Sequence, residues 1–335
     1  MPIRVAVDAM GGDLAPNEVI LGALAAVDEE PGLEVLLVGD EARVRDAVDW
    51  TRPPRVTLVH APEAIGMDEH PVEALKKKRR SSIALGVGLV REGKAEAFFS
   101  AGNTGACVAA ASMALRRIEG ARRPGIAVTF PSGAGVTVLM DAGANIAPKA
   151  VDLLQYGVMA ATYARRVLGK ESPSVGLLNV GTEGDKGTEL VQEAAKLLRG
   201  APGLRFHGFV EGHDLFRGTT DVVVCDGFVG NAVLKAAEGQ AAAMVKRVKA
   251  VLAATFQSEL ERHKVAVALH ELAQQLDWAE YGGAPLLGVE GIVVIGHGRS
   301  EARAIQNGIK VAARAAGRDL NREIAAELAK LPVAV

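Results

Sequence analysis

Short apolar runs alternate with longer amphipathic stretches along the whole chain. Apolar runs predict β-strands at 3–7, 35–38, 55–59, 95–99, 125–130, 135–140, 175–179, 205–209, 221–225 and 291–295. Helical spacing of apolar residues predicts helices at 16–27, 41–48, 71–79, 82–92, 104–117, 148–168 and 188–199, then a long helix from about 231 and another after 300. Strands that alternate with helices are typical of an α/β fold whose sheet is buried on both faces.

The composition agrees with this architecture. The chain has 335 residues, of which 49% are hydrophobic, 4% are aromatic and 38 are glycine, which suits buried strands and tight turns. No linker or internal repeat divides it, so we expect a single α/β catalytic body over residues 1–335 with a central cleft. The two cysteines, Cys107 and Cys225, lie far apart, which favours a reducing cytoplasm over a disulfide framework.

Charge and hydropathy narrow the range of partners. A net charge of −2 gives no global argument for binding nucleic acid or membranes. The first residues lead directly into a strand, so no signal peptide is expected. No run of about 18 apolar residues predicts a transmembrane helix. We therefore expect a cytoplasmic protein with no nucleic-acid partner.

Polar loops follow six of the predicted strands. In open α/β sheets, ligands bind at such loops beyond the carboxyl ends of the strands, so we expect the six to converge on one cleft. None reads GxxxxGK[ST], and none reads GxGxxG with an acidic residue about 20 positions on, so ATP or NAD binding has little support. The loops are 8–13, 100–105, 141–145, 179–187, 226–231 and 296–300.

The loop at 100–105 has the features of an anion site. It joins an apolar strand to a helix, and the free N–H groups of a helix start attract anions. Gly102 lets the backbone approach a ligand, while Ser100, Asn103 and Thr104 offer side-chain hydrogen bonds. An ordinary strand-to-helix turn with a polar cap is the alternative interpretation.

Five short motifs together carry a resemblance to a known family. They are Asp8-Ala9-Met10-Gly11-Gly12-Asp13 with Ala15-Pro16, Ser100-Ala101-Gly102-Asn103-Thr104-Gly105, Leu178-Asn179-Val180-Gly181, Val224-Cys225-Asp226-Gly227-Phe228-Val229-Gly230-Asn231 and Gly282-Gly283-Ala284-Pro285-Leu286-Leu287-Gly288. In order and spacing, over about residues 3–315, the set resembles the PlsX family of bacterial phosphate acyltransferases.

The resemblance implies an enzyme that makes acyl phosphate from acyl-[acyl carrier protein] and inorganic phosphate. The product would supply the glycerol-3-phosphate acyltransferase that begins phospholipid synthesis. The implied fold is a three-layer α/β/α sandwich, similar to the isocitrate/isopropylmalate dehydrogenases and the phosphotransacetylases. The resemblance also implies that the protein forms a homodimer with the cleft near the interface. Three rival functions stay open: a phosphotransacetylase acting on short acyl-CoA, a decarboxylating dehydrogenase of the same fold, and a non-enzymatic scaffold recruited to membranes.

The implied chemistry needs groups that bind and orient rather than a covalent nucleophile. Orthophosphate is itself a nucleophilic anion, so the enzyme must hold it and stabilise a tetrahedral oxyanion. Acids at strand ends also suit Mg²⁺, but thioester phosphorolysis does not require it, so we expect no metal and no cofactor. The predicted catalytic residues are Lys186, His297, Asp226 and Asn231. The predicted substrate-binding residues are Asp8, Gly11, Gly12, Asp13, Ser100, Gly102, Asn103, Thr104, Asn145 and Asn179.

Each catalytic candidate also has a structural interpretation. Lys186 is either a phosphate or oxyanion contact or a solvated loop lysine. His297, between two glycines, either protonates the leaving thiolate or is structural. Asp13, Asp226 and Asn231 are equally suited to capping helices and turns.

Two basic clusters suit an acidic partner. The run Lys76, Lys77, Lys78, Arg79 and Arg80 is the predicted docking site for acyl carrier protein, with a solvated helix face or a phosphate site as the alternatives. A second cluster at Arg116, Arg117, Arg122 and Arg123 is suited to share that task. Nucleic acid is disfavoured because aromatic residues do not interleave with the basic ones.

Residues 231–278 predict a protruding helical hairpin. Dimer packing and weak, reversible membrane contact are the two interpretations, the second giving a peripherally membrane-associated protein. The side chains expected to insert in the second case are Phe256, Leu260, Val265, Val267 and Leu269.

Overall fold

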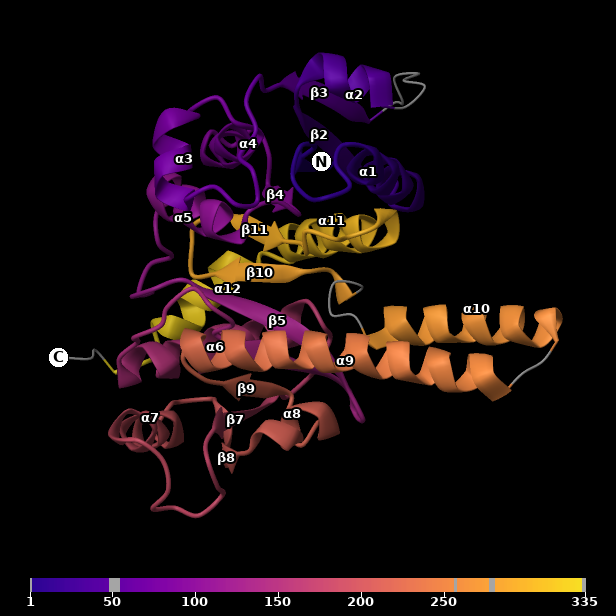
Figure 1. Ribbon diagram of the computed structural model, residues 1–335. Coiled ribbons are helices and arrows are strands. Elements are labelled where there is room, and N and C mark those ends of the chain that lie inside the picture. Colours follow the sequence, from indigo (N-terminus) through magenta and orange to yellow (C-terminus); the bar gives the residue numbers. More distant parts are fainter. Residues whose placement is uncertain (1, 48–54, 256–257, 277–280, 333–335) are drawn as a thin grey trace.

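The computed structural model describes residues 2–47, 55–255, 258–276 and 281–332, which form a large mixed sheet with helices on both faces (Figure 1). The sheet has eleven strands in the described part of the chain, in the order β3-β2-β1-β4-β11-β10-β5-β6-β9-β7-β8. The strands are β1 (Ile3–Asp8), β2 (Leu33–Gly39), β3 (Val56–His60), β4 (Ala97–Ser100), β5 (Gly125–Ser132), β6 (Gly135–Met140), β7 (Ser174–Leu178), β8 (Arg205–Val210), β9 (Val222–Val224), β10 (Ala284–Leu287) and β11 (Ile292–Ile295).

The helices cover the sheet and bury their apolar sides against it. They are α1 (Asn17–Glu29), α2 (Glu41–Ala47), α3 (Pro71–Lys77), α4 (Ser82–Arg91), α5 (Thr104–Ala114), α6 (Ala150–Arg166), α7 (Glu189–Arg199), α8 (Gly212–Arg217), α9 (Gly227–Thr255), α10 (Glu259–Leu276), α11 (Ala302–Gly317) and α12 (Leu320–Leu328). Helix α6 lies at the centre of the core, where Leu153, Tyr156, Met159 and Tyr163 are almost completely buried. The predicted α/β class and the layered arrangement are confirmed.

The polar loops leave the sheet at two opposite edges. Strands β1, β4 and β11 are parallel, whereas β10 is antiparallel to both of its neighbours, β11 and β5. Strand β5 is in turn antiparallel to β6, and β6, β9 and β7 are parallel to one another. The carboxyl ends of β6, β9 and β7 therefore point away from those of β1, β4 and β11.

The expectation that all six loops converge is consequently wrong. The first edge carries loops 8–13, 100–105 and 296–300, and the second edge carries loops 141–145, 179–187 and 226–231. The amino end of β10 pairs with Ile295 at the first edge and its carboxyl end pairs with Gly125 at the second, so the edges are separated by about 10 Å along this strand.

Three short elements were not predicted, and several boundaries shift. Strand β10 lies inside the Gly282–Gly288 motif and has only four residues, flanked by glycines with positive φ. Helices α8 and α12 were also missed. The predicted helix 104–117 ends at Ala114 because Leu115 adopts an extended conformation, and the predicted helix 148–168 narrows to Ala150–Arg166.

Helices α9 and α10 pack against each other and extend well past the sheet (Figure 1). Helix α9 begins at Gly227, four residues before the predicted start. Phe256 and the end of the predicted 231–278 segment lie outside the described residues. None of the helices in the described ranges is long and apolar enough to span a membrane.

Candidate active site

At the first edge, the loops after β1, β4 and β11 bind one another. The Ser100 hydroxyl donates to Asp8 Oδ2 at 2.7 Å and accepts from the Gly102 amide at 3.0 Å. The Asp13 amide donates to the Gly298 carbonyl at 2.7 Å. Burial raises the pKa of the Asp8 carboxyl, and its hydrogen bonds with hydroxyl and amide donors oppose that rise. Asp8 and Ser100 thus face the protein interior.

The glycines of this edge are explained by close backbone packing. A Cβ at Gly11 would overlap the Asp8 carboxylate and would lie 2.7 Å from the Gly102 amide nitrogen. Gly12 has a φ of +109°, a conformation that favours glycine. These contacts leave no need for a ligand to account for Gly11, Gly12 or Gly102.

The start of α5 uses its own asparagine as a cap. Asn103 Oδ1 accepts from the Ala106 amide at 3.0 Å, while Nδ2 donates to the carbonyls of Gly66, Met67 and Glu69 at 3.0–3.2 Å. The expectation that Asn103 and Ser100 donate to a phosphate is therefore not met, since both side chains are engaged within the protein. Thr104 is exposed at this helix start.

At the second edge, a buried carboxylate organises the loop after β6. Asp141 is completely buried, and its Oδ1 accepts from the amides of Ile126, Gly143 and Ala144 at 3.0–3.1 Å. Its Oδ2 accepts from the Asn145 amide at 2.7 Å and from Asn145 Nδ2 at 3.3 Å. Burial raises the pKa of the Asp141 carboxyl, and the amide donors oppose the rise. Asp141 was missed by the sequence analysis, although it directly follows a predicted strand.

The start of α9 packs directly on this loop. The Gly227 amide donates to the Asn145 carbonyl at 2.9 Å, and Asp226 Oδ1 accepts from the Val229 amide at 2.9 Å. A Cβ at Gly230 would overlap the Asp141 carbonyl oxygen, so only glycine fits there. Asp226 therefore caps the helix, whereas Asn231, one turn further on, is exposed.

The loop 179–187, after β7, is held at the Lys186 carbonyl by two amide side chains, those of Asn179 and Gln192. Asn179 Nδ2 donates to the Lys186 carbonyl at 3.1 Å. The Lys186 side chain itself is exposed. Because β7 pairs with β9, the loop of Lys186 and the start of α9 follow neighbouring strands.

Two arginines stand beside this edge on a second buried carboxylate. Arg122 Nε lies 3.1 Å from Asp152 Oδ1 and Arg123 Nε lies 3.9 Å from Asp152 Oδ2, with the Asp152 side chain fully buried. Asn145 Nδ2 also donates to the carbonyl of Pro124, at 2.6 Å, which joins the arginine segment to the Asp141 loop. The sequence identified the arginines as a basic cluster but missed Asp152, in the first turn of α6, because the approach of residues 122–123 to that helix has no local signal.

His297 lies apart from the other predicted catalytic residues. It belongs to the first edge, where its Nδ1 accepts from the Arg299 amide at 3.3 Å and its Nε2 lies 3.8 Å from Glu238 Oε2 of α9. Asp226, Asn231 and Lys186 belong to the second edge. The four predicted catalytic residues therefore do not form one group.

The basic run at 76–80 is only partly available to a partner. Lys78 Nζ binds the Glu69 carboxylate and donates to the Ala64 carbonyl at 2.8 Å. The other four basic residues of the run are exposed: Lys76, Lys77, Arg79 and Arg80.

The buried thiols are not suited to nucleophilic chemistry. Burial raises the pKa of Cys107 to about 12 and raises the pKa of Cys225 well above its usual range. Within the described ranges, no group of three or more His, Cys, Asp or Glu side chains is placed to hold a metal ion.

Comparison with known proteins gives the family. The model of the fatty acid synthesis protein family matches residues 3–323. The chain is 46% identical to a phosphate acyltransferase from Pelotomaculum thermopropionicum, over 99% of this chain and 96% of the relative. It is 48% identical to a phosphate acyltransferase from Heliobacterium modesticaldum, over 92% and 93% of the two chains.

Solved structures show the fold. A phosphotransacetylase from Streptococcus pyogenes aligns over 94% of both chains with a TM-score of 0.63 at 20% identity. The EutD phosphotransacetylase from Staphylococcus aureus aligns over 94% of both chains with a TM-score of 0.62 at 16% identity. The predicted likeness to the phosphotransacetylase fold is confirmed. On the strength of its full-length relatives, the chain belongs to the fatty acid synthesis protein family and is one of its phosphate acyltransferases.

Proposed function

We propose that the enzyme transfers an acyl group from acyl-[acyl carrier protein] to inorganic phosphate. A phosphate oxygen attacks the thioester carbonyl, the C–O bond forms, the C–S bond breaks, and the leaving thiolate takes up a proton. The acyl phosphate would then supply a glycerol-3-phosphate acyltransferase for phospholipid synthesis. The family assignment and the full-length relatives named phosphate acyltransferase support this reaction.

We place the reaction at the second edge of the sheet. The observation that carries this placement is that Lys186, on the loop after β7, and Asn231, in the first turns of α9 after β9, present exposed side chains, and that β7 and β9 are paired. An ammonium group and an amide suit a phosphate dianion and a developing oxyanion. Asn145, Asn179 and Asp226 use their polar atoms within the protein, so they act as positioning residues. His297, at the other edge, is outside this centre.

The test follows acyl phosphate formation, trapped with hydroxylamine, from one acyl group carried either by acyl carrier protein or by coenzyme A. We expect faster reaction with the carrier protein, and a loss of turnover of at least about tenfold in Asn231→Ala. Gln240→Ala, an exposed residue of the same helix, is the control and should react normally. Preference for coenzyme A would favour the phosphotransacetylase alternative. Normal turnover in Asn231→Ala would reject the placement.

We propose the exposed part of the basic run as the docking site for the carrier protein. Lys76→Glu with Lys77→Glu should raise the KM for acyl-[acyl carrier protein] and leave the KM for a small thioester unchanged, and added salt should raise the wild-type KM similarly. Lys196→Glu with Arg322→Glu, at exposed positions of α7 and α12, is the matched control. Equal effects on both thioesters would show that the run does not read the carrier protein.

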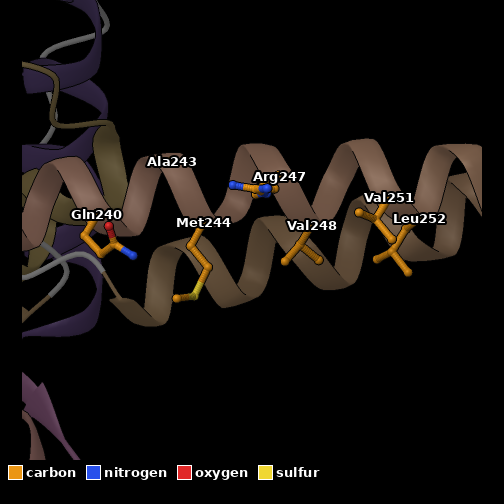
Figure 2. Close-up of a pocket in the computed structure, with 7 residues that line it drawn as sticks. All are labelled: Gln240, Ala243, Met244, Arg247, Val248, Val251 and Leu252. Carbon is orange, nitrogen blue, oxygen red and sulfur yellow. The ribbon is translucent and has the colours of Figure 1, made fainter.

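The hairpin α9–α10 is the proposed element for homodimer formation or membrane contact. Figure 2 shows Met244, Val248, Val251 and Leu252 along one side of α9, where Met244 and Val251 are more than half exposed. Leu269 is buried, so its predicted insertion into a membrane is wrong, while Leu260 and Val267 are exposed.

One pair of measurements separates the two roles. Leu260→Ser with Val267→Ser should abolish sedimentation with anionic vesicles if the hairpin gives the enzyme a peripheral place on the membrane. Light scattering of the same variant should show a changed mass if the hairpin instead joins two copies.

A further inference from the structure

The three most exposed large hydrophobic side chains of the described residues all lie at the second edge. Val180 is 79% exposed, Ile146 is 73% exposed and Phe228 is 69% exposed. Single exposed apolar residues are normal on a protein surface, but a concentration at one edge marks a contact site. Val180 and Ile146 lie on the loops after β7 and β6, and Phe228 lies in the first turn of α9, which follows β9; these three strands are adjacent in the sheet.

The backbone brings the segments that carry at least two of these residues together. The Gly227 amide donates to the Asn145 carbonyl at 2.9 Å, and Phe228 and Ile146 are the residues that directly follow this bonded pair. Val180 lies three residues past Leu177, which pairs with Val224 four residues before Phe228. The three apolar side chains thus border one region rather than three separate ones.

Each apolar residue is also close in the chain to a polar residue that binds or positions groups in the proposed reaction centre. Ile146 follows Asn145, Val180 follows Asn179, and Phe228 stands three residues before Asn231, on the same side of α9. The amides of Asn145 and Asn179 are engaged within the protein, but the exposed side chains of Lys186 and Asn231 lie on the same segments as Val180 and Phe228. This arrangement matches a substrate with a polar reacting end and an apolar tail.

We infer that Ile146, Val180 and Phe228 form the contact surface for the acyl chain of the thioester substrate, an inference that rests on the reaction proposed above. The mixed surface favours an acyl chain over a second copy of this protein, because the exposed Lys186 and Asn231 side chains share these segments and suit the polar reacting end of a thioester, while the apolar side chains suit its tail. The three residues would then determine how strongly chain length affects binding. A short acyl group has less apolar surface to place on them.

The experiment compares butanoyl and hexadecanoyl thioesters on the same carrier protein. Phe228→Ser and Ile146→Ser should each raise the KM for the hexadecanoyl substrate about tenfold and leave the KM for the butanoyl substrate within about twofold of wild type. Met113→Ser, which changes a side chain that is 63% exposed on α5, is the control and should alter neither KM. All three sites are exposed, so melting temperatures should match the wild type.

The possible failures are distinguishable. If the wild-type enzyme forms no acyl phosphate from either thioester, the proposed function fails before the acyl surface is tested. If the wild type is active but both KM values rise equally in the variants, the residues do not read chain length and the inference is wrong. A changed mass in light scattering, together with equal KM effects, would show that this edge is instead an interface between copies.

Discussion

Replacing one oxygen of the Asp141 carboxylate should destabilise the proposed active edge strongly, because this carboxylate accepts five hydrogen bonds. Asp141→Asn keeps the size of the side chain but turns one acceptor oxygen into a donor. In the structure, Oδ1 accepts three amide hydrogen bonds and Oδ2 accepts two. An asparagine at this position keeps the most hydrogen bonds when its oxygen faces the three backbone amide donors. Its NH₂ group then faces the amide and side-chain donors of Asn145, with which it cannot form hydrogen bonds.

The cost follows from the two hydrogen bonds that this orientation loses. A hydrogen bond to a charged group contributes about 1.5–3 kcal/mol, so the free energy of unfolding should fall by about 3–6 kcal/mol. That is a large share of the roughly 5–15 kcal/mol that stabilises a typical folded domain. The loop that carries Asn145 and supports the start of α9 should also lose its fixed position, so acyl phosphate formation should fall.

Urea denaturation of the wild type and Asp141→Asn measures this loss directly. Asp46→Asn, on the exposed face of α2, is the control and should change the free energy of unfolding by less than about 0.5 kcal/mol. A loss below about 1 kcal/mol in Asp141→Asn would refute the reasoning, because it would mean that the two donors of Asn145 find other partners at little cost.

Three further predictions concern single side chains. Lys186→Ala should lower turnover at least about tenfold without changing the melting temperature, because the exposed ammonium packs against little, and Lys196→Ala should change neither. Asn103→Ala should destabilise the protein by about 2 kcal/mol because it loses its helix cap and its loop contacts, whereas Thr104→Ala should leave stability unchanged. A calorimetric melting temperature of Asn103→Ala equal to that of the wild type would contradict this structural role. The pKa of Asp221 is lowered in the folded protein: burial acts to raise it, but the hydrogen bonds from Ser174 and the ion pair with Lys170 outweigh burial. The ionised Asp221 should therefore stabilise the fold by about 1 kcal/mol, screened by solvent, above the unfolded pKa near 3.8, and this stabilisation should be lost as pH falls through the lower folded pKa. An Asp221→Asn variant whose free energy of unfolding is reduced equally at pH 7 and pH 2 would contradict this.

The alternation of strands and helices was predictable because it rests on local periodicity. Runs such as 135–140 and 188–199 carry their period in their own residues, and the structure places a strand and a helix there. The direction of a strand has no such local signal. Strand β10 is four residues long, contains Pro285 and lies between glycines, so nothing in its sequence announces a strand that is antiparallel to both neighbours. Because β11 and β5 then run in the same direction, it is the antiparallel step from β5 to β6 that places loops 141–145, 179–187 and 226–231 at the opposite edge.

The family was identifiable from its motifs, but the role of each polar residue within a motif was not. Asn103 and Asn231 read alike in sequence, since each lies in a glycine-containing loop at a helix start. In the fold, Asn103 meets three carbonyls from the segment around Gly66, about 35 residues away, and is used completely. Asn231 lies beside Gly143 of the loop after β6 and stays exposed, one turn inside α9.

The same distinction explains why the two edges of the sheet differ in chemistry. At the first edge, Asp8, Ser100 and Asn103 satisfy one another or nearby backbone, so the loops there are locked. At the second edge, the buried carboxylates of Asp141 and Asp152 hold the surrounding segments in place. Asp141 fixes the loops, and Asp152 holds Arg122 and Arg123. Because carboxylates beneath the surface hold this frame, the exposed residues above it are left available to a substrate. A site that binds an anion needs such a division, since a group that supports the frame cannot also give its hydrogen bonds to phosphate.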